Sequence, residues 1–64
     1  MEYTNSQIRE LIAEYIHSAR DRAILYDRLV DGMTFEKLAE KHDMSVRQIK
    51  NIVYKTQEQL FKHL

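Results

Sequence analysis

The sequence predicts an all-α fold of four helices, the last two of which form a helix-turn-helix. The 64 residues include one glycine, Gly32, and no proline, so residues that break helices are scarce. Apolar side chains recur every three or four residues along most of the chain, which is the spacing of one helix face. Capping residues precede these stretches. We therefore expect one domain, residues 1–64, with four helices around a single core.

The first predicted helix begins after the capping residues Thr4, Asn5 and Ser6. Thr4 and Gln7 have the spacing of a capping box, in which each side chain bonds the backbone of the other residue. We expect this helix to end near residues 17–18. Its apolar face should serve core packing and consists of Ile8, Leu11, Ile12, Tyr15, Ile16 and Ala19.

A short break at residues 18–21, with Ser18 as a cap, is expected before the second helix; a helix continuous through Arg20 is the alternative. The second helix covers roughly residues 21–30. Asp31 and Gly32 end it, because glycine readily adopts the left-handed backbone found after helices. The expected inward residues are Ala23, Ile24, Tyr26, Leu29 and Val30, with Leu25 broadening the face and Met33 following into the core.

The third predicted helix covers residues 35–42, with Thr34 as its N-cap. Asp43 follows where the chain must bend, and aspartate tolerates a left-handed backbone better than most residues. Small Ala39 suits a close crossing with the next helix. The residues that share the inner face are Phe35, Leu38, Ala39 and His42, and Met44 is expected to turn inward.

The fourth helix is expected from Val46 to near the C-terminus, with Ser45 as N-cap and Gln48 as its capping-box partner. A short helix, a tight turn and a longer helix with polar outward positions are the helix-turn-helix pattern. Residues 1–33 then supply supporting helices, and residues 34–64 form the motif. The apolar stripe of the last helix is Val46, Ile49, Ile52, Val53, Leu60, Phe61 and Leu64.

The charges are distributed unevenly, although the formal net charge is zero. Residues 1–40 carry five basic and eight acidic side chains, whereas residues 41–64 carry five basic and two acidic ones. Positive potential therefore gathers on the last helix and favours double-stranded DNA as a partner. Arginine and lysine donate to guanine, and glutamine and asparagine pair with adenine. We expect base contacts from Arg47, Gln48, Lys50 and Asn51, phosphate contacts from Ser45 and Lys41, and DNA-backbone contacts from Tyr54 and Lys55.

Catalytic chemistry is not expected. Cysteine is absent, and the three histidines His17, His42 and His63 are too widely spaced for a recognised metal site. A lone glycine cannot form a phosphate-binding loop, and a chain of this size has little room for a closed pocket. We expect no enzyme activity, cofactor or metal. No apolar run is long enough for a membrane span and no signal peptide is visible, so a cytoplasmic location is expected.

The motif region resembles region 4 of the sigma-70 class of bacterial RNA polymerase sigma factors. TFEKLA (residues 34–39) looks like the scaffold helix of that domain, and DMSVRQIKNI (residues 43–52) is similar to the DVTRERIRQI stretch of primary sigma factors. RAIL (residues 22–25) and DGMT (residues 31–34) match the helix and turn before the motif. The resemblance covers residues 18–64.

The resemblance implies that the last helix binds a promoter −35 element and that the domain docks on the flap of the polymerase β subunit. Arg47, Gln48, Lys50 and Asn51 would inherit the base and phosphate contacts. Val46 stands where primary sigma factors carry arginine, and Asp27 and His42 stand at positions that are usually apolar. Because the sigma domains that melt DNA are missing, the resemblance implies a stand-alone transcription regulator of bacterial or phage origin.

Two other interpretations remain open. The chain could be a protein-interaction module that binds RNA polymerase, a sigma factor or another regulator without DNA; its acidic first half favours this. It could also form a homodimer through Leu60, Phe61 and Leu64, which exceed what one core can cover. A paired dimer predicts two DNA half-sites about one helical turn apart.

Overall fold

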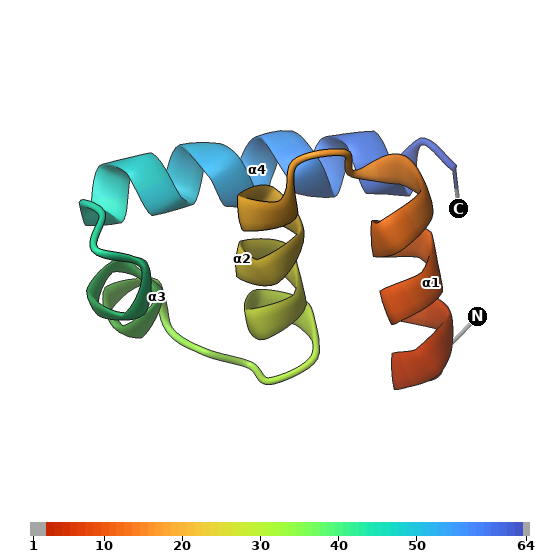
Figure 1. Ribbon diagram of the computed structural model, residues 1–64, viewed down its shortest axis with the longest axis horizontal. Coiled ribbons are helices and arrows are strands. Elements are labelled where there is room, and N and C mark those ends of the chain that lie inside the picture. The colour runs from red at the N-terminus through yellow and green to blue at the C-terminus, as the bar shows by residue number, and fades with distance from the viewer. Residues whose placement is uncertain (1–2, 64) are drawn as a thin grey trace.

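The computed structural model describes residues 3–63, and this part of the chain contains four helices and no strand. The helices are α1 (Asn5–Tyr15), α2 (Ala19–Leu29), α3 (Phe35–His42) and α4 (Val46–Phe61). Figure 1 shows α4 lying across the ends of α1 and α2, with α3 beside the first turns of α4. The predicted all-α class with four helices is confirmed. None of the described helices is long and apolar enough to cross a membrane.

All four predicted N-caps are confirmed. The side-chain oxygens of Thr4, Ser18, Thr34 and Ser45 each accept a hydrogen bond from a backbone N–H of the first helical turn. Both predicted capping boxes are also present, and at α4 the two bonds between Ser45 and Gln48 measure 3.0 and 3.1 Å. These bonds satisfy amides that have no partner inside the helix, so each helix begins at a defined residue.

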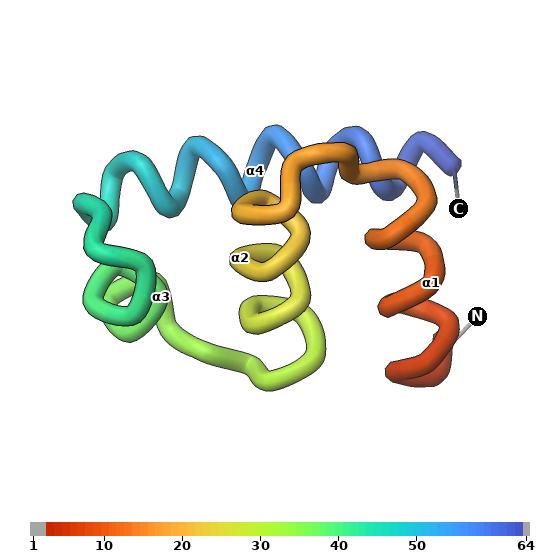
Figure 2. Tube along the Cα trace, viewed as in Figure 1, coloured from red at the N-terminus to blue at the C-terminus, as the bar shows by residue number. Residues whose placement is uncertain are grey.

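The break between α1 and α2 comes earlier than the sequence predicts. Helix α1 ends at Tyr15 and not near residues 17–18, because Ile16 has an extended backbone with φ −109° and ψ 114°. The Nη1 of Arg22 donates to the carbonyl oxygens of Ile16 and His17, at 2.9 and 3.1 Å, which satisfies backbone groups left over at this end. The alternative of a helix continuous through residue 20 is therefore wrong. Figure 2 shows the chain reversing there, so that α1 and α2 run in opposite directions.

The two turns that flank α3 use left-handed backbone. Gly32, after α2, has φ 68°, and Asp43, after α3, has φ 54° and ψ 50° as predicted. The N–H of Met44 donates to the carbonyl oxygen of Ala39 at 2.9 Å, which closes the end of α3. Helix α2 ends at Leu29, one residue before the predicted limit, with Val30 as its C-cap.

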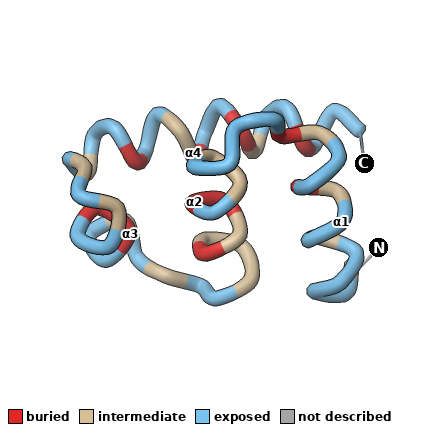
Figure 3. The backbone as a smooth tube through the Cα atoms, in the orientation of Figure 1, coloured by how far each residue is buried: buried red, intermediate tan, exposed pale blue. Residues whose placement is uncertain are grey.

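The core consists of two clusters that meet at α2. Ile24 belongs to a cluster on the α3 side, and the adjacent Leu25 belongs to a cluster on the α1 side. Helix α4 contributes to both, as the buried positions along its inner side in Figure 3 illustrate. The first cluster is Ile24, Leu38, Ala39, Ile49 and Val53, and the second is Ile12, Ile16, Leu25 and Leu60.

Several predicted core positions are wrong. Ala19 and Ala23 are exposed, since Ala19 begins α2 instead of extending the face of α1. Phe61 is 53% exposed, although the stripe of α4 predicted it inward. Leu25, expected only to broaden a face, is completely buried. Two polar residues that were not predicted inside, Asp27 and Thr56, are buried as well; the hydroxyl of Thr56 donates to the Ile52 carbonyl oxygen at 2.7 Å.

Candidate nucleic-acid interface

Helices α3 and α4 are joined by the turn at residues 43–45, and their facing sides are buried together. Leu38 and Ala39 of α3 pack in one cluster with Ile49 and Val53 of α4. Ala39 is only 9% exposed, consistent with a close approach of the two helices. Because the inner side of α4 is committed to this core, its remaining sides face solvent.

The outward side of α4 carries the residues predicted to contact DNA. Arg47, Asn51 and Tyr54 follow one another at steps of four and three residues, which places them along one stripe of the helix. Tyr54 is 57% exposed. The structure places all eight predicted residues at exposed positions, namely Lys41, Ser45, Arg47, Gln48, Lys50, Asn51, Tyr54 and Lys55.

The polar groups of Ser45 and Gln48 are partly occupied by the capping box. The Oε1 of Gln48 accepts the Ser45 N–H, and the Ser45 Oγ accepts the Gln48 N–H. A bidentate pair with adenine needs both the oxygen and the amide nitrogen of glutamine. Gln48 therefore retains its two N–H donors for a ligand, and Ser45 retains its hydroxyl proton, which could bond a phosphate.

Lys41 lies on α3 and is held by an ion pair within the protein. Its ammonium donates to the Oδ2 of Asp27 at 2.8 Å. This hydrogen bond, helped by the charges of Asp27 and Asp31, raises the pKa of Lys41, although desolvation acts in the opposite direction. The ammonium is still half exposed, so a phosphate contact would share it with Asp27.

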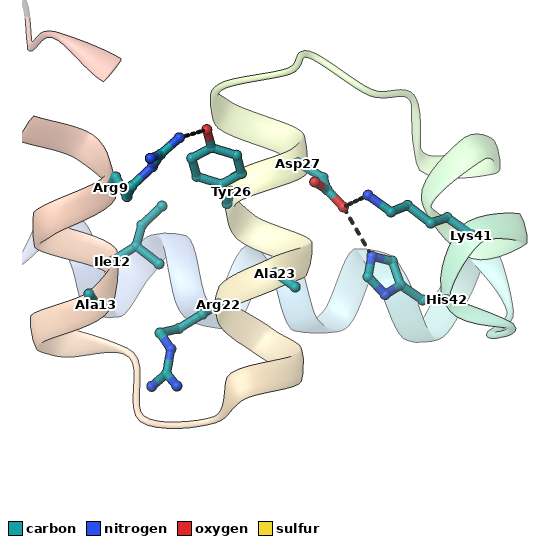
Figure 4. Close-up of a pocket in the computed structure, with 9 residues that line it drawn as sticks. All are labelled: Arg9, Ile12, Ala13, Arg22, Ala23, Tyr26, Asp27, Lys41 and His42. Atoms are coloured by element: carbon teal, nitrogen blue, oxygen red, sulfur yellow. Dashed lines mark hydrogen bonds and ion pairs between the residues drawn. The ribbon is translucent and has the colours of Figure 1, made fainter. Parts of the chain in front are cut away.

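Asp27 joins α2 to the end of α3, a contact that the sequence did not predict. Its side chain is 7% exposed, and its Oδ2 lies 3.2 Å from the Nε2 of His42 as well as 2.8 Å from the Lys41 ammonium (Figure 4). A buried carboxylate needs such partners, because desolvation disfavours an unpaired charge. The contact holds the end of α3 against α2. The expectation that His42 is a partly buried helix-end residue is confirmed.

The ring of Phe35 contacts two of the candidate residues, Lys50 and Tyr54. The Lys50 ammonium lies 5.7 Å from the centre of this ring, and the Tyr54 ring meets it edge-on at 6.0 Å. The Arg28 guanidinium lies over the same ring at 4.4 Å and donates to the Met33 carbonyl oxygen at 2.8 Å. A cation over an aromatic ring is attracted to its negative face. Phe35 thus orients Lys50 and Tyr54 on the surface of α4.

Residues 3–63 contain no recognisable metal-binding cluster. No group of three or more histidine, aspartate and glutamate side chains gathers there in a way that could hold a metal ion. The buried Asp27 is already bonded to two neighbouring side chains.

The chain was also compared with known proteins. It matches no family model, no curated protein and no solved structure. These comparisons identify no sigma region 4-like domain in the chain.

Proposed function

We propose that this protein is a sequence-specific DNA-binding transcription regulator that resembles a stand-alone sigma region 4 domain. In this proposal α3, the turn and α4 form a helix-turn-helix, and α4 enters the major groove of double-stranded DNA. One observation carries it: Arg47, Lys50 and Asn51, in the first turns of α4, are exposed and belong to neither core cluster. Had these side chains packed against α1 and α2, no groove contact could form.

The proposed DNA contacts are of two kinds, to base edges and to the phosphate backbone. Arg47 and Lys50 can donate to the O6 and N7 of guanine, and Asn51 can pair with adenine through both atoms of its amide. Ser45, Gln48 and Lys55 suit phosphates, which fix the position of the helix without reading sequence. Tyr54 lies one turn further along and can reach the DNA backbone. Lys41 is a weaker phosphate contact because Asp27 already binds it.

The charge distribution also favours an orientation in which α4 faces the DNA. The acidic excess lies in residues 1–40, which form α1, α2 and most of α3, and the basic excess lies in residues 41–64. A duplex would attract the α4 side and repel the opposite side. Affinity should therefore fall steeply as salt rises, because phosphate contacts release counterions.

Selection of DNA sequences by the purified protein tests the proposal. The selected duplex and a scrambled duplex are then titrated at about 50 mM and about 200 mM salt, where counterion release makes a large difference. We expect an enriched motif and weaker binding at the higher salt. Failure to enrich any motif, together with no binding at the lower salt, would overturn the proposal.

A protein-interaction module is the second candidate, and the exposed aromatic residues of α4 favour it. Tyr54 is 57% exposed and Phe61 is 53% exposed, and with Glu58 they line a shallow surface hollow. RNA polymerase, a sigma factor or another regulator would then bind there. Retention of polymerase by the tagged protein after nuclease treatment, without any shift of DNA, would favour this candidate over the first.

Homodimerisation through the end of α4 has less surface available than the sequence predicts. Leu60 is buried in the protein's own core, Phe61 is exposed, and Leu64 lies outside the described residues. Sedimentation at several concentrations decides between a monomer and a dimer.

A further inference from the structure

A groove lies between α1, α2 and the end of α3, and no residue of α4 lines it (Figure 4). Its volume is about 420 Å³, within the range of about 300–1,000 Å³ that is usual for small-molecule sites. Ile12 and Ala13 of α1 and Ala23 of α2 supply apolar surface. Because the two alanines are short, the groove has room for a ligand between the longer side chains around it.

Two guanidinium groups line the groove, and neither is neutralised by a carboxylate of residues 3–63. Arg9 donates to the hydroxyl of Tyr26 and lies 4.8 Å above its ring. Arg22 donates from Nη1 to two carbonyl oxygens at the end of α1. The ion pairs found in the described chain involve Arg20, Lys41 and His42 instead. Each guanidinium has five N–H groups, so both keep donors for a further partner.

Asp27 is the one carboxylate that residues 3–63 place in the groove, and it does not cancel this positive charge. Asp27 is 7% exposed, and its Oδ2 already accepts the Lys41 ammonium and contacts His42. Figure 4 shows Arg9 and Arg22 at separate ends of the α1–α2 contact, with Ile12 between them and Ala23 on the side of α2 toward His42. The groove thus combines apolar surface with an excess of cationic donors. Guanidinium groups bind carboxylates and phosphates strongly because two parallel hydrogen bonds form.

We infer that this groove binds a small organic anion, with its phosphate or carboxylate on Arg9 and its short apolar body on Ile12, Ala13 and Ala23. The site is separate from the outward side of α4 and does not depend on DNA binding. A protein that fails to bind DNA would still bind the anion.

Titration of the full chain by amide NMR tests the inference with three probes: phenyl phosphate, inorganic phosphate and phenol. Phenyl phosphate joins the anionic group to an apolar ring, and the other two each offer one part alone. We expect phenyl phosphate to bind saturably, to shift amides around residues 9–13, 22–27 and 41–42, and to bind at least about tenfold more tightly than either fragment.

Two variants and one control locate the site. Arg9→Gln should weaken phenyl phosphate binding about tenfold, since a hydrogen bond to a charged group is lost. Ala23→Leu should block binding by filling the groove at an exposed position, so the core is left intact. Arg20→Gln removes an arginine of α2 that does not line the groove and should leave binding unchanged. The same spectra report whether each variant folds.

Three results would overturn the inference. The first is no saturable shift with phenyl phosphate in the millimolar range. The second is equal binding of inorganic phosphate, which would indicate general attraction to positive charge. The third is equal weakening by Arg9→Gln and Arg20→Gln.

Discussion

Asp27 determines how the end of α3 is held. Its carboxylate is buried between α2 and α3 and receives Lys41 and His42 on the same oxygen. The sequence suggested only that Asp27 and His42 stand at positions apolar in sigma region 4. The structure brings the two side chains together, so each polar side chain finds a partner in the other.

Replacing Asp27 with asparagine should lower the free energy of unfolding by about 1–3 kcal/mol, because the charge that satisfies two buried or half-buried partners is lost. Urea unfolding of the wild type and of Asp27→Asn measures the difference. The matched control is Asp31→Asn, which changes an exposed aspartate just beyond α2. An equal, small effect of both substitutions would show that the buried contact contributes nothing.

The raised pKa of Lys41 predicts a stability change at high pH. A base with a raised pKa in the folded state stabilises the fold below its unfolded pKa of about 10.4, and this stabilisation is lost as the pH rises through the folded value. Unfolding should therefore become easier as the pH rises above about 10.4, and more so in the wild type than in Asp27→Asn. Equal pH dependence in the two proteins would contradict the role of this ion pair.

Arg47 and Asn51 are the residues whose truncation should alter DNA specificity. Each substitution by alanine should weaken binding to the selected sequence by about 1–3 kcal/mol and relax the preference at one base pair. Arg20→Ala, on α2, is the control and should change binding little. Uniform weakening across all sequences would assign Arg47 or Asn51 to phosphate contact instead.

At the scale of the helices, most helix ends were predictable from residue types that lie close together in the sequence. The four N-caps, the two capping boxes and the left-handed Asp43 follow from residue types at fixed spacing, and all are confirmed. The early end of α1 was missed because Arg22, six residues beyond Ile16, helps to end that helix. Local periodicity contains no information about such a contact.

The capping box of α4 should control the stability of the turn before it. Ser45→Ala removes an acceptor for the Gln48 N–H and should cost about 1 kcal/mol. Ser6→Ala is the control, because Ser6 is an exposed serine inside α1 and does not cap it. Thermal unfolding compares the two variants, and a loss no greater than that of Ser6→Ala would show that the cap is dispensable.

At the scale of the whole molecule, the arrangement of the elements decides which surfaces are available. The exposure of the eight candidate residues agrees with the helical periodicity of the last stretch. The ion pair of Lys41 with Asp27 and the cluster of Lys50 and Tyr54 on Phe35 were not predictable, since they join residues 14–19 positions apart on different helices. The groove between α1, α2 and α3 was missed for the same reason.

The separation of charge across the molecule predicts how binding depends on salt. Lys55→Ala should weaken binding similarly for all DNA sequences and should reduce the slope of log affinity against log salt by about 1. Arg20→Ala should leave the slope unchanged, because it lies on α2. Titrations of the selected duplex at several salt concentrations provide both slopes, and an unchanged slope in Lys55→Ala would exclude Lys55 from phosphate contact.

The central claim is that the outward side of α4 enters the groove of a DNA duplex. Amide and side-chain NMR shifts of the isotopically labelled protein, titrated with the selected duplex, test it most directly. The claim predicts that the largest shifts fall on residues 45–55, including the side chains of Arg47 and Asn51, while α1 changes little. Shifts concentrated on α1 and α2, with residues 45–55 unchanged, would contradict it.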